Sequence, residues 1–190
     1  MKTHQTLCVL LAAMTVLARA GMVGIARIPD PPPAVDGTLG RLNSSPSTLA
    51  WSAREQVVFG VEKLTGPNDL SGELYLGWDE NCLYVGARVV DDTVVQPYFG
   101  SDVYKGDHLE VFLDVPRRDP GLRSGRHVVQ IGLSPGDFGT GAGAVPPEVV
   151  QWSPNLGSVP GARIAARRNA DGYQIEAALP WNALGVAKPD

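Results

Sequence analysis

The sequence predicts an all-β protein, an antiparallel β-sandwich of the jelly-roll type. Strand-length runs of alternating apolar and polar residues recur along the chain, and turn-forming residues separate them; the 190 residues include 22 Gly and 16 Pro. The runs cover residues 55–62, 73–79, 83–90, 108–115, 127–133, 162–168 and 173–179. Apart from a single turn at 181–184, no segment shows a convincing helical period. Sheets packed on sheets are therefore the expected architecture.

Two short connections between these runs predict hairpins. Residues 79–81, Asp-Glu-Asn, separate two strand-like runs and favour a tight turn. Residues 169–172, Asn-Ala-Asp-Gly, do the same near the end of the chain, and Gly172 can adopt the positive φ that such turns need. Both connections predict that the strands on either side are antiparallel neighbours.

Alternation also predicts which side chains share a face. In the run 108–115, Leu109, Val111 and Leu113 form one face, which we expect to be core. The opposite face carries His108, Glu110, Phe112 and Asp114. The core set of the run 127–133 is Val129, Ile131 and Leu133.

Polar side chains collect on the faces turned away from the predicted core. If the runs 108–115 and 127–133 are neighbouring strands, Arg126, Val128 and Gln130 point to the same side as Glu110. In the run 83–90, Arg88 shares a face with Tyr84. A sheet face with Glu, Arg, Gln and aromatic side chains can serve as a polar binding surface.

Size and charge narrow the possible functions. A chain of 190 residues has the size of one domain. Sixteen basic against 20 acidic residues give a net charge of −4, and no basic block is present. Because nucleic-acid binding depends on clustered Lys and Arg, we expect no nucleic-acid partner.

The first 20 residues have the pattern of a secretory signal peptide. A weakly positive start is followed by the apolar run 7–18 and by Ala-Arg-Ala at 18–20. The alternative, a short buried or membrane helix, is disfavoured because a bilayer core needs about 20 apolar residues. No later stretch is long enough to span a membrane. We therefore expect an exported protein, extracellular or periplasmic, in which a proline-rich segment at 21–33 leads into a domain over 34–190.

The sequence contains no catalytic constellation, so whether the protein takes part in an enzyme stays open. Asp107 and Glu110 point to opposite faces of a strand, which disfavours a glycosidase pair. After the leader only Cys82, His108 and His127 remain as Cys or His, too few for a closed zinc site without carboxylates. Cys82 alone also rules out an internal disulfide.

A structural calcium ion is the one cofactor that the residues suggest. Asp91, Asp92 and Asp102 are clustered oxygen ligands of the kind that calcium prefers. Loop aspartates also make turns, so this alternative stays open. Asp107 follows Gly106 and either starts the strand or helps to hold a cation.

Seven motifs in order resemble the family 9 carbohydrate-binding modules. They are Val-Asp-Gly-Thr-Leu at 35–39, Trp-Ser-Ala at 51–53, the run 76–85 with Gly-Trp-Asp-Glu-Asn, Val-Val-Asp at 89–91, Gly-Asp-His-Leu-Glu-Val-Phe-Leu-Asp at 106–114, Phe-Gly-Thr-Gly at 138–141, and the run 172–181 that ends in Leu-Pro-Trp. The resemblance covers about 34–190. It implies a jelly-roll β-sandwich, often with calcium, and binding of a terminal sugar between two aromatic rings.

The resemblance also implies individual site residues. Tyr104 matches a clamp aromatic, and Glu110 matches a glutamate that accepts a sugar hydroxyl. A basic residue of the family falls at Gln130, or at Val129 without a gap, and alternation favours Gln130; the Arg is absent in either register. The second clamp aromatic and the last strands of the family fold would lie beyond Asp190, so we expect a module without its last strands or the front of a longer protein.

Each candidate has an alternative role. The rings of Tyr104 and Trp152 suit the apolar face of a pyranose, but they can also cover loop ends of the sandwich. Glu110 can bind sugar, stay solvated, or pair with Arg88 across strands. The predicted carbohydrate-binding set is Tyr104, Glu110, Gln130, Arg88 and Trp152.

Two functions follow from these residues. The first is non-catalytic binding of a polysaccharide or oligosaccharide, which would direct an exported carbohydrate-degrading system, such as a glycoside hydrolase, to its substrate. The alternative is a structural or interaction domain of the same fold in a larger cell-envelope protein, without sugar binding. A downstream domain in a longer protein is a further possible partner.

Overall fold

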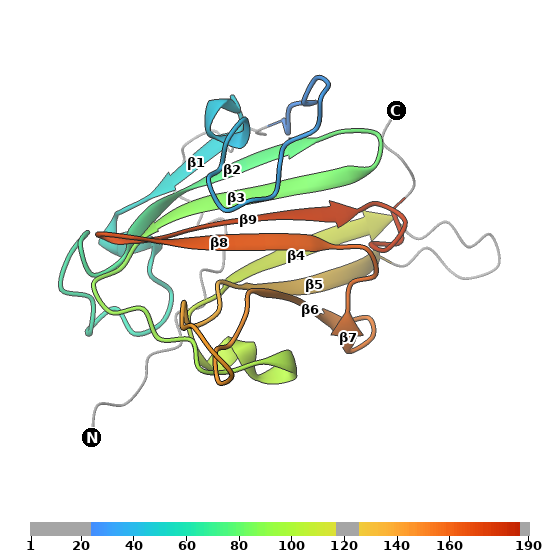
Figure 1. The fold of residues 1–190 in the computed structure, drawn as a ribbon. Coiled ribbons are helices and arrows are strands. Elements are labelled where there is room, and N and C mark those ends of the chain that lie inside the picture. Colours follow the sequence, from blue (N-terminus) through green and yellow to red (C-terminus); the bar gives the residue numbers. More distant parts are fainter. Residues whose placement is uncertain (1–23, 117–125, 187–190) are drawn as a thin grey trace.

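Two antiparallel sheets packed face to face make up the protein (Figure 1). The structure, a computed structural model, describes residues 24–116 and 126–186. The five-stranded sheet runs in the order β1 (Thr48–Trp51), β2 (Ser71–Trp78), β3 (Cys82–Val90), β9 (Gly172–Pro180) and β8 (Arg163–Asn169). The four-stranded sheet runs in the order β4 (Leu109–Pro116), β5 (Arg126–Ser134), β6 (Glu148–Ser153) and β7 (Gly157–Ser158). The predicted β-sandwich is confirmed.

Most predicted strands and both predicted hairpins are present. Six of the seven runs correspond to β2, β3, β4, β5, β8 and β9. The turn at 79–81 joins β2 to β3, where Asp79 Oδ1 accepts hydrogen bonds from the backbone N–H groups of Asn81 (2.7 Å) and Cys82 (2.8 Å). The turn at 169–172 joins β8 to β9, with Asn169 paired to Gly172 at φ +152°. The turn expected at 181–184 is also present, closed by two hydrogen bonds to the Pro180 carbonyl.

The prediction of a strand at 55–62 is wrong. This segment holds the 3-10 helix η2 (Arg54–Gln56), followed by turns, and the first strand lies earlier, at β1. Gln56 explains the difference, because its side-chain Oε1 accepts hydrogen bonds from the backbone N–H groups of Ser52 and Ala53 and folds the chain back. Gly60 follows at φ +75°, a turn conformation.

The main core lies between the sheets, as the alternation predicts. Val129, Ile131 and Leu133 of β5 are buried against Ile175 and Leu179 of β9. From β4, the predicted inward-facing residues Leu109, Val111 and Leu113 pack against the same cluster.

The outer face of the five-stranded sheet is closed by the segment that precedes β1. Leu39 and Leu42, the latter in the 3-10 helix η1 (Leu42–Ser44), pack on the outward-facing Tyr75 and Tyr84. Glu176 of β9 anchors this segment, because its Oε1 accepts hydrogen bonds from the backbone N–H groups of Asp36 and Gly37. This contact explains the Val-Asp-Gly motif.

The sandwich is open along one side, where β1 and β4 form the sheet edges. An apolar groove of about 570 Å³ lies there. Its lining includes Trp51, Leu74, Leu83, Leu109 and Val111. In the part of the chain described, no helix has both the length and the apolar character needed to cross a bilayer. Three predictions lie outside the described residues: the leader at 1–20, the beginning of the proline-rich segment, and the further strands expected beyond Asp190.

Candidate carbohydrate-binding site

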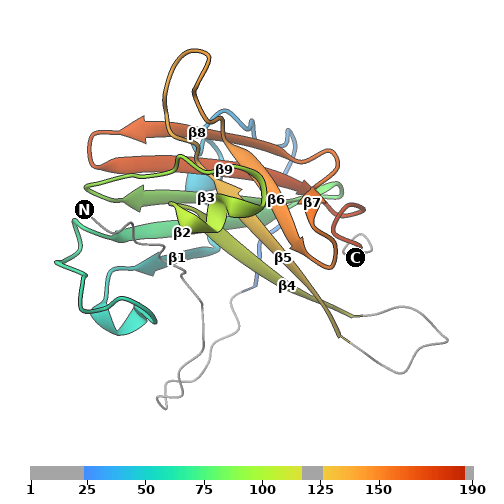
Figure 2. The ribbon, with the colours of Figure 1, turned by 90° about the horizontal axis from the view of Figure 1, so that it is seen from below.

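The outer face of the four-stranded sheet carries most of the predicted binding residues. Its strands lie in front of the five-stranded sheet in Figure 2, with the 3-10 helix η3 (Gly100–Lys105) packed on β5 and β6. Val103 of η3 is fully buried and fixes the helix there. The sheet is therefore covered by η3 at one end of this face, and the outward-facing residues of β4 and β5 continue beyond it.

Glu110 and Gln130 form a polar pair at the centre of this face. In the antiparallel register, Glu110 of β4 lies opposite Gly132 and Phe112 lies opposite Gln130, so Glu110 and Gln130 are diagonal neighbours. The Gln130 Nε2 group donates a hydrogen bond to Glu110 Oε1. This contact confirms that the two side chains share a face, and it supports Gln130 over Val129, which is buried in the core.

Trp152 is brought onto this face by a β-bulge. Gln130 pairs with Ser153 and Ile131 pairs with Gln151, so Trp152 is an extra residue on β6. A bulge redirects the side chain of the inserted residue. The indole covers Gly132: a Cβ built on that glycine would lie 2.4 Å from Cη2 of Trp152. Only glycine at this position allows the ring to lie on the sheet beside Glu110.

Trp152 also joins the sheet to η3. Its Nε1 donates a hydrogen bond to the Ser101 carbonyl at 3.1 Å. The Tyr104 ring meets the indole edge-on, with centroids 6.5 Å apart and planes at 74°. The His108 ring also meets the indole edge-on, with ring centroids 6.0 Å apart and planes at 79°. Tyr104 remains 48% exposed. The two predicted aromatic residues thus form a corner, with Tyr104 as its outer wall.

His108 is a buried, neutral support for Trp152. Burial lowers the pKa of its imidazole, against the opposing effects of a hydrogen bond to Gly106 and of the Glu110 charge. Its Nδ1 lies 2.9 Å from the Gly106 carbonyl, which can only accept, so Nδ1 carries the proton. Nε2 is buried and has no hydrogen-bond partner among the described residues.

Side-chain hydrogen bonds hold the loop that carries Tyr104. The buried Gln96 amide donates to the carbonyls of Val103 (3.0 Å) and Asp107 (2.6 Å). At the other end of η3, the Gly100 N–H donates to Glu148 Oε1 of β6 at 2.7 Å. The loop is therefore tied at both ends, which orders the Tyr104 wall before any ligand arrives.

A pair of carboxyl groups closes the base of this loop. Burial, together with the charge of Asp91 and a hydrogen bond to Asp91, raises the pKa of Asp107 to about 7. Burial likewise raises the pKa of Asp91. The Asp107 carboxylate also accepts a hydrogen bond from the Val95 N–H. Asp107 thus stabilises the start of β4, one of the two roles considered for it.

The described residues do not fit the predicted calcium site. Asp102 pairs with Lys105 at 2.9 Å instead of joining Asp91 and Asp92. Within residues 24–116 and 126–186, no group of three or more Asp, Glu, His or Cys side chains is placed to hold a metal ion. Calcium takes six to eight oxygen ligands, so the trio Asp91, Asp92 and Asp102 does not supply a cage.

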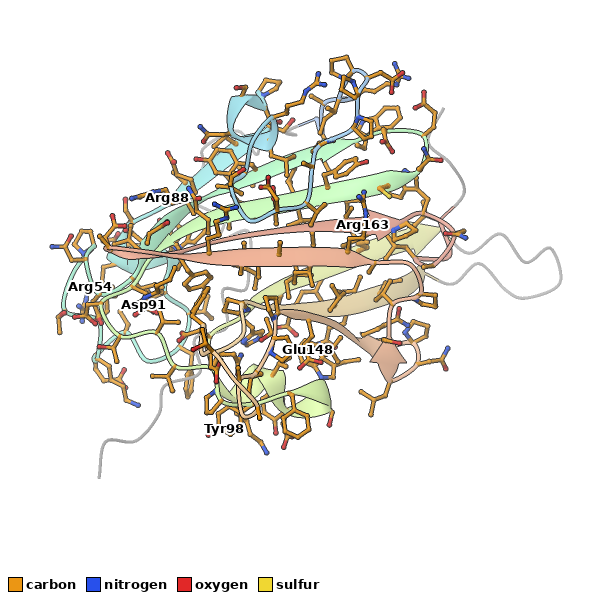
Figure 3. The ribbon with its side chains drawn as sticks, viewed as in Figure 1. Arg54, Arg88, Asp91, Tyr98, Glu148 and Arg163 are labelled. Carbon is orange, nitrogen blue, oxygen red and sulfur yellow. The ribbon has the colours of Figure 1, made fainter. Side chains whose placement is uncertain are left out.

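Arg88 is not part of the cluster. It lies on the outer face of the five-stranded sheet, where its Nη2 pairs with Asp171 Oδ2 at 2.6 Å. Figure 3 shows it on that sheet, whereas Glu148 and Tyr98 lie around the four-stranded sheet. Pairing with Arg88, one of the alternative roles considered for Glu110, is wrong, because β3 and β4 belong to different sheets. Alternation gives the face of a residue within its own sheet, but not which sheet a strand joins.

Four of the five predicted binding residues are therefore brought together: Tyr104, Glu110, Gln130 and Trp152. The roles of His108 and Gly132 in supporting Trp152 were not predicted. The sequence contained one signal for Gly132, since an isolated glycine within a strand often marks a close approach by another group. No sequence signal pointed to the bulge at Trp152.

Comparisons with known proteins agree with this architecture. The pattern of the family described as "Carbohydrate family 9 binding domain-like" matches residues 35–190. A search of curated proteins gave no significant match.

Two similar solved structures are of a family 9 carbohydrate-binding module from Caldicellulosiruptor kristjanssonii. The complex with glucose has a TM-score of 0.55 and 18% identity, covering 87% of this chain and 70% of that one. The complex with cellotriose has a TM-score of 0.54 and 17% identity, covering 87% and 68%. They share the fold with this protein. From the sequence match over nearly the whole described domain, the chain belongs to the carbohydrate family 9 binding domain-like family.

Proposed function

We propose that the protein binds carbohydrate, without catalysis, on the outer face of the four-stranded sheet. The observation that carries this proposal is the convergence of two aromatic rings with a hydrogen-bonded Glu–Gln pair on one face. The similar structures described as complexes with glucose and cellotriose support the same ligand class.

The chemistry of this face suits a pyranose. The sugar has an apolar C–H face that packs on an aromatic ring, and a rim of hydroxyl groups that need both donors and acceptors. Tyr104 and Trp152 offer rings, the Glu110 carboxylate offers acceptors, and the Gln130 amide offers both kinds of group. The Glu110–Gln130 hydrogen bond holds the polar pair in place, so less side-chain entropy is lost on binding.

The aromatic arrangement favours a ligand that stacks on one side. Tyr104 and Trp152 stand at 74° to each other with their edges in contact, so a sugar ring cannot lie between them. The sugar would instead rest in the corner, with one face on an aromatic ring and its rim toward Glu110 and Gln130. This arrangement differs from the two-ring clamp expected from the family resemblance.

We further propose that the module is exported and directs a carbohydrate-degrading system to its polysaccharide. Support for export comes from the leader pattern of residues 1–20. A binding module without its own chemistry acts by holding an attached or associated enzyme close to the substrate, which raises the effective substrate concentration.

Calorimetric titration with cello- and xylo-oligosaccharides tests the binding proposal. We expect saturable binding by the wild-type chain, and binding reduced at least tenfold in Tyr104→Ala and in Glu110→Ala. Phe59→Ala is the matched control, since Phe59 is 73% exposed but lies in the loop between β1 and β2. A folded wild-type sample that binds none of these glycans would overturn the proposal and leave the interaction-domain alternative.

A further inference from the structure

Two carboxyl groups hold together the two ends of the loop that carries Tyr104. This loop runs from the end of β3 to the start of β4, so it crosses from the five-stranded to the four-stranded sheet. Asp91 is its first residue after β3, and Asp107 lies near its other end. Figure 3 shows Asp91 at the end of the five-stranded sheet and Tyr98, on the same loop, beside the four-stranded sheet. Asp91 is buried, Asp107 is partly buried, and their carboxyl groups are hydrogen-bonded to each other.

The contact between these carboxyl groups depends on one proton. Ionised carboxylates only accept hydrogen bonds, so either Asp91 or Asp107 must be protonated to donate to the other. Each also accepts a hydrogen bond from the loop backbone: Asp91 Oδ1 from the Thr93 N–H at 2.8 Å, and Asp107 from the Val95 N–H. Loss of the shared proton would leave two negative charges in contact, away from most of the solvent that could screen them.

The groups around the pair place the exchange of this proton close to neutral pH. Arg168 of β8 favours the ionised form, whereas Asp92, which follows Asp91 in the loop, disfavours it. Tyr173 of β9 is buried beside the pair, and burial raises the pKa of its phenol, which therefore stays neutral. Burial, together with the charge of Asp91, raises the pKa of Asp107 to about 7.

Hydrogen bonds connect Asp107 to the segment that carries Tyr104. The Asp107 N–H donates to the Val95 carbonyl at 3.0 Å, and the Asp107 carbonyl accepts from the Gln96 side-chain amide at 2.6 Å. The same amide donates to the carbonyl of Val103, the residue before Tyr104 in η3, at 3.0 Å. A displacement of Asp107 is therefore passed to Tyr104, the outer wall of the aromatic corner.

We propose that Asp91 and Asp107 form a proton-controlled latch on this loop, which couples carbohydrate binding at Tyr104 to pH. The inference rests on the proposed function. While the two carboxyl groups share a proton, the loop is closed at its base and Tyr104 is held beside Trp152. When the proton leaves, repulsion between the carboxylates opens the base, and the corner loses its outer wall. Carbohydrate binding is therefore stronger in mildly acidic than in mildly alkaline solution.

The pH dependence of binding tests the latch. Affinity for cellotriose is measured by calorimetry at pH 5.5 and 8.5. The wild-type affinity should be about tenfold higher at pH 5.5, since one proton fully coupled to binding changes the affinity about tenfold per pH unit above its midpoint. Asp107→Asn stays neutral and can still donate to Asp91 and accept from Val95, so it should bind at both pH values as the wild type does at pH 5.5. Glu55→Gln, which removes an exposed carboxylate of η2, should keep the wild-type pH dependence.

Amide NMR reads the state of the loop without any sugar. The backbone signals of Val95, Val103 and Gly106 should change together between pH 5.5 and 8.5 in the wild type. In Asp107→Asn they should stay at the positions that they have in acid. Asp91→Asn supplies a second neutral partner and should give the same result, and a thermal melt of each variant confirms that it is folded.

The outcomes separate the latch from the function on which it rests. Equal wild-type affinities for cellotriose at the two pH values overturn the latch. A wild-type pH dependence that survives in both Asn variants also overturns it and assigns the dependence to another group, such as His108. Failure of the folded wild type to bind cellotriose at either pH overturns the proposed function, and the loop signals then decide the latch. Signals that titrate in the wild type but not in the Asn variants support it, and signals that do not respond to pH overturn it.

Discussion

Replacement of Gly132 by alanine is predicted to displace Trp152 and to weaken sugar binding. The added Cβ would lie 2.4 Å from Cη2, 2.7 Å from Cζ3 and 3.2 Å from Cζ2 of the indole. Ordinary carbon contacts are about 3.5–4.0 Å, so the ring must retreat by about 1 Å. That movement breaks the packing of Trp152 on Tyr104 and His108 and strains its 3.1 Å hydrogen bond to Ser101.

The expected size of the effect follows from these contacts. Overpacking costs about 1–3 kcal/mol, so the free energy of unfolding should fall by about that amount. Binding of cellotriose should weaken about tenfold, which corresponds to about 1.4 kcal/mol. Calorimetric titration measures the affinity, and chemical denaturation measures the stability. Gly143→Ala is the control, because a Cβ there meets nothing within 4 Å.

A double-mutant cycle isolates the contact itself. If the clash with the indole causes the loss of stability, Gly132→Ala should cost much less in a Trp152→Ala background than in the wild type. Equal costs in the two backgrounds would refute this explanation of Gly132. An unchanged affinity of the single Gly132→Ala variant for cellotriose would refute the placement of Trp152 in the binding site.

Three further predictions concern stability. Glu176→Ala should lower the free energy of unfolding by about 2–3 kcal/mol, because two backbone N–H groups lose their carboxylate acceptor. Glu176→Gln keeps one acceptor oxygen, so it should lower the free energy of unfolding by less; a denaturant titration of both variants measures the difference. The folded-state pKa of Asp107 is about 7, above the usual 3.8 of an aspartate, so Asp107 favours folding at low pH, and the melting temperature should fall as the pH rises from 4 to 7. Asp107→Asn should flatten this fall, and an unchanged pH profile in this variant would contradict the explanation. Burial raises the pKa of Asp79, but the hydrogen bonds that its carboxylate accepts from Tyr84, Asn81 and Cys82 outweigh burial and lower the pKa below its usual value. The stabilising contribution of Asp79 should therefore be present above pH 4 and decrease in acid. Asp79→Ala should melt at a lower temperature than the wild type at pH 7, and the difference in melting temperature should narrow as the pH falls below 4.

The sequence predicted the sheets well because period-2 alternation depends on local burial. The inward set of β5, Val129, Ile131 and Leu133, is fully buried, and the β2–β3 and β8–β9 hairpins lie at their predicted turns. At 55–62 the local signal failed because a side chain redirects the backbone. Gln56 caps the turn that replaces the strand expected at 55–62.

β6 was not predicted because its bulge interrupts the alternation. Val149 and Val150 are adjacent and both buried, and Trp152 is the inserted residue. The grouping of Arg88 with Glu110 failed for a different reason. Both lie on outward faces, but which strands share a sheet depends on contacts between residues distant in sequence, and alternation carries no information about them.

The sequence was sufficient to predict that Glu110 and Gln130 share a face, but it was not sufficient to predict the contact between Tyr104 and Trp152. In two adjacent strands, the alternation of apolar and polar residues determines which side chains lie on the outer face, and this places Glu110 and Gln130 together. Tyr104 and Trp152 come from a loop and a bulged strand, and their contact depends on the Ser101 hydrogen bond and the absence of a side chain at Gly132.

The most direct test of carbohydrate binding on this face is an amide NMR titration of the wild-type chain with cellotriose. Saturable shifts are predicted for the Gln130 side-chain amide, the Trp152 indole N–H and the Gly132 backbone, with none for the region around Arg88. Shifts confined to the five-stranded sheet, or no shifts in a folded sample at millimolar ligand, would contradict the account.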